Sequence, residues 1–234
     1  MSRRRLQVPD LVRHVMSRGN GKMRIFLDDV DYRHFIHVLG DSLETHAIEC
    51  WNFCVMPNHY HVTLKPTRPN LSKAIQYVNS EYAKWWNRRH ERVGHVFQGR
   101  FKNQIVDHTQ YLLTLSRYVE RNPVRAGLVE RPEEWPWSSY RAMVGVVSCP
   151  SFLVMLPTLC MFGEEEDTRR AGFVRFVNTA PDDDAMVDRI RSNERILGST
   201  AFKRWVGNAS RSNESAEPTL LSGSESGARS RCDG

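Results

Sequence analysis

The sequence lacks the features of membrane proteins and of proteins driven by nucleotide hydrolysis. It has no run of about 18 apolar residues, and mixed polar sequence rather than an apolar secretory segment follows Met1 to Leu6. It also has no glycine-rich phosphate loop of the Walker type. We therefore expect a cytoplasmic protein of bacterial style that neither enters a membrane nor draws on an external energy source.

Cysteine is scarce, and its spacing shows no even framework. This pattern is typical of reduced thiols in a cytosolic protein rather than of a disulfide scaffold. Among the 234 residues, 40% are hydrophobic, which is enough for one domain of ordinary size plus an appendage. The five cysteines are Cys50, Cys54, Cys149, Cys160 and Cys232.

Basic residues are concentrated in the middle of the chain. Residues 65–131 hold 13 Lys and Arg against 5 Asp and Glu, or +8, so the rest of the chain, with 20 against 22, is at −2 of the total +6. A protein that follows a phosphate backbone and stacks unpaired bases has such a basic belt beside aromatic residues. The alternative is a solvated helix face with core aromatics. The aromatics in question are Tyr82, Trp85, Trp86, Phe97 and Phe101.

A strand with two histidines follows a turn signal at Pro57-Asn58. Apolar and polar residues alternate over residues 59–64, so His59 and His61 should project from one face of a half-buried strand, with the apolar residues on the other. Side chains two residues apart on a strand lie roughly 6 to 7 Å apart, which lets two imidazoles share one metal ion. The alternative is a pair of ordinary half-exposed histidines.

Hydrophobic periodicity predicts a strand, helix, strand, strand, helix, strand order followed by a further helix. This order favours an α+β fold in which an antiparallel sheet has helices covering one face. The expected strands are 11–18, 46–56, the histidine strand and 101–106; the expected helices begin at Asp28-Asp29, run from about 71 to 90, and begin again near Asp107 or Thr109.

Tyr118 lies at the edge of the apolar stripe of that last helix. At 100° per residue it is about 60° from Leu115, and Asn122 is about 40° from Tyr118. Such a position suits a side chain that packing anchors while its functional end faces a neighbouring sheet. A boundary tyrosine with a locally satisfied hydroxyl is the alternative, and Tyr111, within about 20° of Tyr118, is a substitute candidate.

Four ordered motifs across roughly residues 10 to 145 resemble the single-tyrosine HUH nucleases, and among them the REP-associated tyrosine transposases. A weaker match continues to about residue 207. The motifs are His14-Val15-Met16-Ser17-Arg18-Gly19-Asn20, Met56-Pro57-Asn58-His59-Tyr60-His61, Gly94-His95-Val96-Phe97-Gln98-Gly99-Arg100-Phe101 and Arg117-Tyr118-Val119-Glu120-Arg121-Asn122-Pro123-Val124-Arg125-Ala126-Gly127-Leu128.

The resemblance implies an RRM-like or ferredoxin-like core and a site that nicks and rejoins single-stranded DNA. It implies Tyr118 as the nucleophile, a 5′-phosphotyrosine intermediate, and Mg2+ or Mn2+ held by His59, His61 and Asn122. The implied partner is single-stranded DNA with short palindromic, REP-like hairpins, bound by a monomer or homodimer. From charge and closeness to the motifs, we expect six residues near phosphates: Arg18, Arg100, Lys102, Arg117, Arg121 and Arg125.

Two other classes of function stay open. One is a domesticated sequence-specific DNA-binding regulator without transposition activity. The other is a zinc-stabilised binding module that uses Cys50, Cys54, His59 and His61, although the spacing from cysteine to histidine is shorter than a zinc finger uses.

The chain divides into four predicted segments. Residues 1–10 form a flexible basic arm, and residues 11–147 form the nuclease domain. Residues 148–207 form a helical appendage, where short apolar pieces alternate with acidic runs. Residues 208–234 have almost no apolar content, which predicts a disordered tail.

Overall fold

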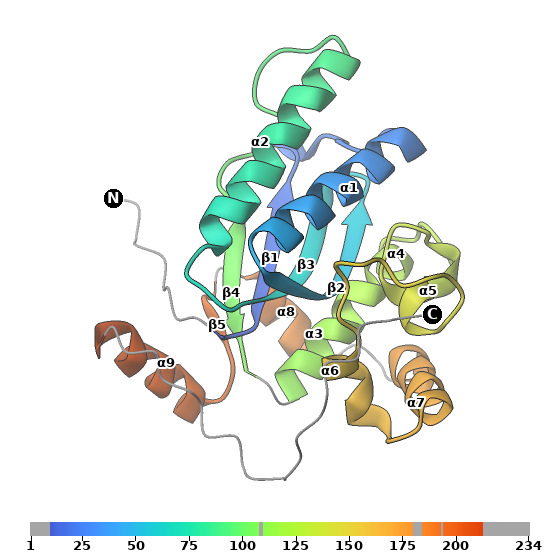
Figure 1. The fold of residues 1–234 in the computed structure, drawn as a ribbon, viewed down its shortest axis with the longest axis vertical. Helices are drawn as coiled ribbons and strands as arrows, with labels where there is room; N and C mark the ends of the chain where they lie inside the picture. The colour runs from blue at the N-terminus through green and yellow to red at the C-terminus, as the bar shows by residue number, and fades with distance from the viewer. Residues whose placement is uncertain (1–9, 108–109, 180–183, 193, 213–234) are drawn as a thin grey trace.

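A five-stranded sheet organises the molecule (Figure 1). The computed structural model describes residues 10–107, 110–179, 184–192 and 194–212. The predicted arm, apart from Asp10, and the predicted tail beyond Ser212 lie outside the described residues. Within the described ranges, no helix combines the length and the apolar character that crossing a membrane requires.

The predicted order of the core elements is confirmed. The first six strands and α-helices are β1 (Arg13–Arg18), α1 (Asp29–Thr45), β2 (Ile48–Met56), β3 (His59–Pro66), α2 (Leu71–Arg89) and β4 (Lys102–Val106). They form an α+β fold, as predicted. Asp28 caps α1 by accepting hydrogen bonds from the amides of Val30 and Asp31, which fixes where that helix begins.

The strands lie in the order β2-β3-β1-β4-β5. The β2–β3 hairpin and the β3–β1 and β1–β4 pairs are antiparallel. The short edge strand β5 (Ile196–Leu197) pairs parallel to β4. In the centre of the sheet, Met16 of β1 lies opposite His61 of β3, and His14 lies opposite Gln104 of β4.

One face of the sheet is covered by α1 and α2, which lie side by side across it (Figure 1). The core between these layers is apolar and aromatic. Tyr60, Val62 and Leu64 of β3 point into it and are fully buried. The prediction that these three residues form the core face of the histidine strand is therefore confirmed.

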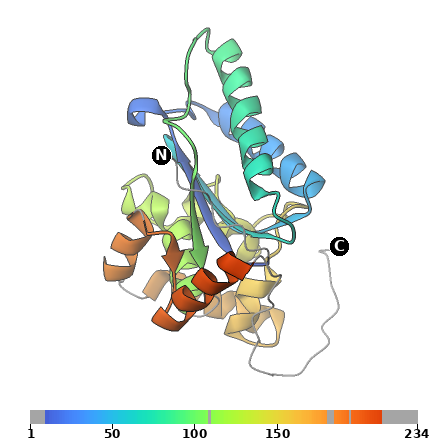
Figure 2. The same ribbon diagram turned by 90° about the vertical axis from the view of Figure 1, so that its left-hand side faces the viewer.

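The opposite face is covered by a second helical layer (Figure 2). There α3 (Gln110–Glu120) packs on β2, and Leu112, Leu115 and Tyr118 join a second buried cluster. The expectation that helices cover only one face is wrong. The second layer includes a helix near residue 190. It packs on residues that are distant in the sequence, and no local sequence pattern predicted this contact.

The remaining helices follow α3. They are α4 (Asn122–Arg125), α5 (Tyr140–Met143), α6 (Leu156–Leu159), α7 (Glu166–Thr179), α8 (Asp184–Arg191) and α9 (Thr200–Ser212). A 3-10 turn at Asn20–Lys22 precedes α1, and others lie at Pro132–Glu134 and Cys160–Phe162. Helix α8 packs against α3. Helix α9 continues through Ser212, past the predicted boundary at residue 207.

Candidate active site

The alternation of β3 directs both histidines toward α3. The His59 and His61 rings meet edge to face, with 4.9 Å between centroids. His61 is only 2% exposed, whereas His59 is half-buried. The two imidazoles therefore share one face of the strand as predicted, but that face is covered by the second layer instead of being open to solvent.

Tyr118 reaches the same place from α3. Its ring stands perpendicular to that of His61, with 5.5 Å between centroids. The guanidinium carbon of Arg125 lies 5.5 Å from the centre of the tyrosine ring. The side chain is 5% exposed. Packing thus fixes the ring, and a cation lies beside it.

Asn122 follows where the chain breaks out of α3 and begins α4. Pro123 comes next and has no N–H to bond the Val119 carbonyl oxygen, which accounts for the break. The Asn122 side chain nevertheless lines the same cavity and lies close to His59. Its Nδ2 has no hydrogen-bond partner among the described residues.

Burial keeps the imidazoles neutral at physiological pH. It lowers the pKa of His59 to about 4; the charge of Arg18 adds to this effect, and the nearby Asn122 side chain opposes it. Burial, followed by the charges of His59, His14, Arg18 and Arg191, places the pKa of His61 well below its usual value. A neutral imidazole is the form that binds metal ions.

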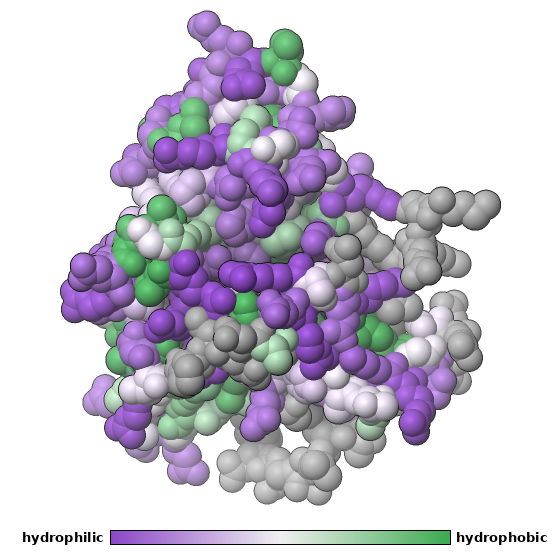
Figure 3. All heavy atoms as spheres, turned by 180° about the vertical axis from the view of Figure 1, so that it is seen from behind, coloured by the Kyte–Doolittle hydropathy of each residue, from purple (hydrophilic) through white to green (hydrophobic). Residues whose placement is uncertain are grey.

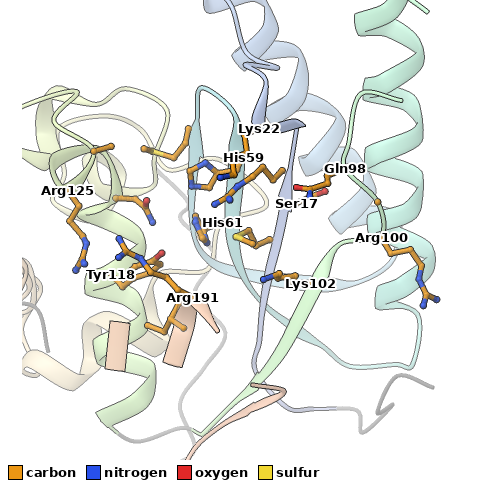
Figure 4. Close-up of a pocket in the computed structure, with 17 residues that line it drawn as sticks. Ser17, Lys22, His59, His61, Gln98, Arg100, Lys102, Tyr118, Arg125 and Arg191 are labelled. Atoms are coloured by element: carbon orange, nitrogen blue, oxygen red, sulfur yellow. The ribbon is translucent and has the colours of Figure 1, made fainter. Parts of the chain in front are cut away.

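The histidines, Tyr118 and Asn122 line a cavity of about 690 Å³ (Figure 4). Its wall is rich in cations from four parts of the chain. Those that the charge argument anticipated are Arg18, Arg100, Lys102 and Arg125; those that it missed are Lys22 and Arg191. In Figure 4 Arg100 points away from the histidines, while Arg191 lies beside Tyr118.

Two of the predicted DNA-binding residues do not reach this cavity. The Arg117 guanidinium lies 4.6 Å from the ring centre of Phe176, and its side chain is buried. Arg121 donates a hydrogen bond from Nη1 to the Val177 carbonyl oxygen at 3.1 Å. Both arginines thus face α7, on the side of α3 away from the histidines.

The substitute tyrosines lie elsewhere. Tyr111 sits under the guanidinium of Arg189, which is 5.1 Å from its ring centre, and Tyr77 is exposed. The Tyr82 hydroxyl donates to the Ile25 carbonyl oxygen inside the first core. Among the described residues that line the cavity, Tyr118 is the single tyrosine.

The four side chains of the zinc alternative do not gather. A bulge between Cys50 and Asn52 shifts the register of β2, so that Cys50 packs in the first core and Cys54 in the second. Within the part of the chain that the structure describes, no three His, Cys, Asp or Glu side chains group as a metal site. The structure therefore does not support a Cys2His2 site.

The ligand atoms that His59, His61 and Asn122 offer fit a divalent cation. The buried Nε2 of His61 has no hydrogen-bond partner among the described residues. Such an orphaned atom is rare in a folded protein and indicates a missing ion or water. The Asn122 amide nitrogen also lacks a partner among them, but it is a donor and suits water or a phosphate oxygen. Two imidazoles and one amide oxygen would leave coordination positions open for a substrate.

Three residues that the sequence reasoning missed complete the surroundings. His14 and Gln104 form a hydrogen-bonded chain to His61 across β1 and β4. The strand alternation of β1 carried this signal, because His14, Met16 and Arg18 share one face. No sequence signal marked Arg191, which reaches the cavity through the packing of α8.

Seen from the side opposite to Figure 1, the molecular surface is largely hydrophilic, with scattered apolar patches (Figure 3).

Three comparisons with known proteins agree. The family model described as "Transposase IS200 like" matches residues 7–122. A Haemophilus influenzae protein named as a REP-associated tyrosine transposase is 25% identical over 122 residues, which cover 47% of this chain and 69% of that protein. The structure of a REP-associated tyrosine transposase bound to a REP hairpin aligns with a TM-score of 0.53 at 17% identity, over 66% of this chain and 91% of the other.

The solved structure confirms the fold, and the family model spans both the histidine strand and the tyrosine helix. The resemblance to REP-associated tyrosine transposases that the motifs indicated is therefore confirmed. Residues 7–122 of this chain belong to the family of IS200-like transposases.

Proposed function

We propose that this protein cuts and rejoins single-stranded DNA at short palindromic sequences that fold into hairpins, with Tyr118 as the nucleophile. One juxtaposition carries the proposal. The Tyr118 ring meets the His61 ring at 5.5 Å inside a cavity lined by cations. The hairpin substrate is inferred from the REP hairpin bound to the structural relative.

The cleavage step forms one bond and breaks one. The Tyr118 oxygen bonds to the phosphorus of the scissile phosphate, and the bond from phosphorus to the 3′ oxygen of the preceding nucleotide breaks. The phenol proton leaves to solvent, and the departing 3′ oxygen takes up a proton. The products are a 5′-phosphotyrosine link and a free 3′-OH. Reversal of this step reseals the strand or transfers it to another end.

His59, His61 and Asn122 are the residues that would hold Mg2+ or Mn2+. The bound cation would stabilise the negative charge that builds on a non-bridging phosphate oxygen. The protein's own part is to present neutral imidazoles on a rigid strand, which burial ensures. Nitrogen ligands suit Mn2+ better than Mg2+.

The cations around the cavity would bind the phosphates next to the cleaved one. Arg18 comes from β1, Lys22 from the following turn, Arg125 from α4 and Arg191 from α8. Because they approach from different elements, they would fix the strand in register rather than only attract it. Phosphate contacts of this kind position a nucleic acid without reading its bases.

The test is covalent capture. Purified full-length protein is incubated with end-labelled single-stranded hairpin DNA and Mn2+, and the reaction is analysed on a denaturing gel. We expect a labelled protein–DNA adduct that disappears when EDTA removes the metal. Mass spectrometry of the digested adduct should place the nucleotide on Tyr118.

Other results would point elsewhere. An adduct mapped to Tyr111, Tyr77 or Tyr82 would contradict the assignment of the nucleophile. Hairpin binding without an adduct at any metal concentration would favour the domesticated DNA-binding regulator. An adduct that forms equally in EDTA would remove the metal from the mechanism.

A further inference from the structure

An asparagine at the β2–β3 turn fixes which nitrogen of His59 carries the proton. Asn58 donates a hydrogen bond from Nδ2 to the Lys22 carbonyl oxygen at 3.1 Å. A carbonyl oxygen only accepts, so the amide must point its nitrogen at Lys22 and its oxygen the other way. That oxygen lies 2.6 Å from Nδ1 of His59. In neutral His59 the proton therefore sits on Nδ1, and Nε2 keeps its lone pair.

A second amide does the same for His61 through one intermediate. Gln104 of β4 donates from Nε2 to the carbonyl oxygens of Glu194 at 2.9 Å and Arg189 at 3.3 Å. These two acceptors orient the amide so that Oε1 faces Nδ1 of His14, 2.8 Å away. His14 must then carry its proton on Nδ1, which leaves its Nε2 as an acceptor.

This series of hydrogen bonds, from Gln104 through His14, ends at His61 in the cavity. Nε2 of His14 lies 2.8 Å from Nδ1 of His61, so His61 is the donor in this hydrogen bond. The remaining nitrogen, Nε2 of His61, is then unprotonated. It is buried and has no hydrogen-bond partner among the described residues. The rings of His14 and His61 are also stacked nearly parallel, which holds their orientation.

We propose that Asn58 and the Gln104–His14 pair are positioning residues that lock both histidines with the proton on Nδ1, so that both Nε2 lone pairs face one cation. This inference rests on the metal site of the proposed function. It also gives the C-terminal part of the chain a role, because Arg189 of α8 and Glu194 of the turn that follows supply the carbonyls that orient Gln104. A histidine's other ring nitrogen commonly sets its tautomer in metal sites.

The direct test is NMR of metal-free protein labelled with ¹⁵N-histidine, which distinguishes protonated from unprotonated ring nitrogens. His59→Gln and His61→Gln variants identify the signals of each ring. In the wild-type protein we expect both rings to carry the proton on Nδ1. Asn58→Ala should release His59 alone, and Gln104→Leu should release His61 alone, so each variant is the control for the other.

Mn2+ affinity, followed by EPR titration, gives a second readout that does not depend on cleavage. We expect Asn58→Ala, Gln104→Leu and His14→Phe each to weaken Mn2+ binding about 10- to 100-fold. Gln98→Leu removes an exposed amide that lines the same cavity, and it should change neither readout.

The outcomes separate this inference from the proposed function. A wild-type ring that carries its proton on Nε2 would overturn the inference, as would unchanged tautomers and Mn2+ affinity in Asn58→Ala and Gln104→Leu. If wild type binds no more Mn2+ than a His59→Ala/His61→Ala double variant, the proposed metal site fails. The tautomers of His59 and His61 still test whether Asn58 and the Gln104–His14 pair set the position of the proton.

Discussion

The two faces of β3 have opposite chemistry, although they alternate along the same eight residues. On the α1–α2 face, Tyr60 is buried among Phe35 and Phe97, and its hydroxyl donates to Asn79 Oδ1 at 2.8 Å. On the α3 face, His61 Nε2 and Thr63 Oγ1 are buried without a hydrogen-bond partner among the described residues. The Tyr60 hydroxyl on the first face is therefore hydrogen-bonded, whereas the second face holds buried polar atoms without a partner among the described residues.

This difference shows how the fold tolerates an unsatisfied site. Each buried polar atom without a partner costs about 1 to 3 kcal/mol, which a marginally stable domain tolerates only where other packing compensates. The apolar face provides that packing, because Tyr60, Val62 and Leu64 lie in a cluster that joins the sheet to two long helices. The same strand thus stabilises the domain on one side and presents ligands on the other.

Tyr118→Phe should give the largest functional effect. The substitution keeps the ring and its packing against His61, but it removes the oxygen proposed to attack phosphorus. We expect cleavage and covalent adduct to fall by on the order of 1,000-fold or more, while stability changes by no more than about 1.5 kcal/mol. Tyr111→Phe, on the same helix but outside the cavity, is the matched control and should keep full activity. Persistent cleavage by Tyr118→Phe would make this tyrosine structural.

Tyr60→Ala and His59→Ala form a matched pair that separates the two faces. Deleting the Tyr60 ring leaves a cavity in the first core, so we expect a loss of about 3 to 5 kcal/mol in the free energy of unfolding. His59 is half-buried and contacts only the site, so His59→Ala should cost less than about 1 kcal/mol yet abolish metal-dependent cleavage. Chemical denaturation and the adduct assay measure the two effects. Equal destabilisation by both would mean that the faces are not distinct.

The sequence predicted the elements whose signals are local. Alternation identified the histidine strand, and helical periodicity placed Tyr118 at the edge of a buried stripe. Asn122 was harder to place, because the following proline breaks the helix, and only the structure shows its side chain in the cavity.

Contacts between distant segments were not predictable. Arg117 looked like a phosphate ligand from charge and position, but it packs on Phe176, a residue of a helix far along the chain. Arg191 reaches the cavity, and the Gln104 amide finds its carbonyl acceptors, only because α8 and the segment before β5 pack against the site. Composition indicated only a helical appendage there, because nothing in a single sequence states which distant face a short amphipathic helix covers.

Glu120, two residues beyond Tyr118, gives a test that depends on pH. Burial raises its pKa to about 8 from its usual value near 4.5, against the opposing hydrogen bond from Ser139. The folded protein thus keeps a proton that the unfolded chain releases. Stability should therefore fall as pH rises through this window, with a slope of at most about 1.4 kcal/mol per pH unit, and level off above it. Glu120→Gln should flatten this decline in thermal or urea unfolding, and an unchanged slope would show that Glu120 is ionised in the fold.

The smallest expected effect distinguishes arginines on opposite sides of α3. Arg191 lines the cavity, whereas Arg121 donates to the Val177 carbonyl on the α7 side. Each Lys or Arg that contacts a phosphate releases counterions, which adds about 0.7 to the slope of log affinity against log salt for single-stranded DNA. Arg191→Gln should lower that slope by about this amount and weaken hairpin binding a few-fold at low salt, because one phosphate contact is lost. Arg121→Gln keeps a donor for Val177 and should leave the slope unchanged. Fluorescence anisotropy over a range of salt concentrations measures both slopes, and a larger change for Arg121→Gln would place the DNA on the α7 side of the helix instead.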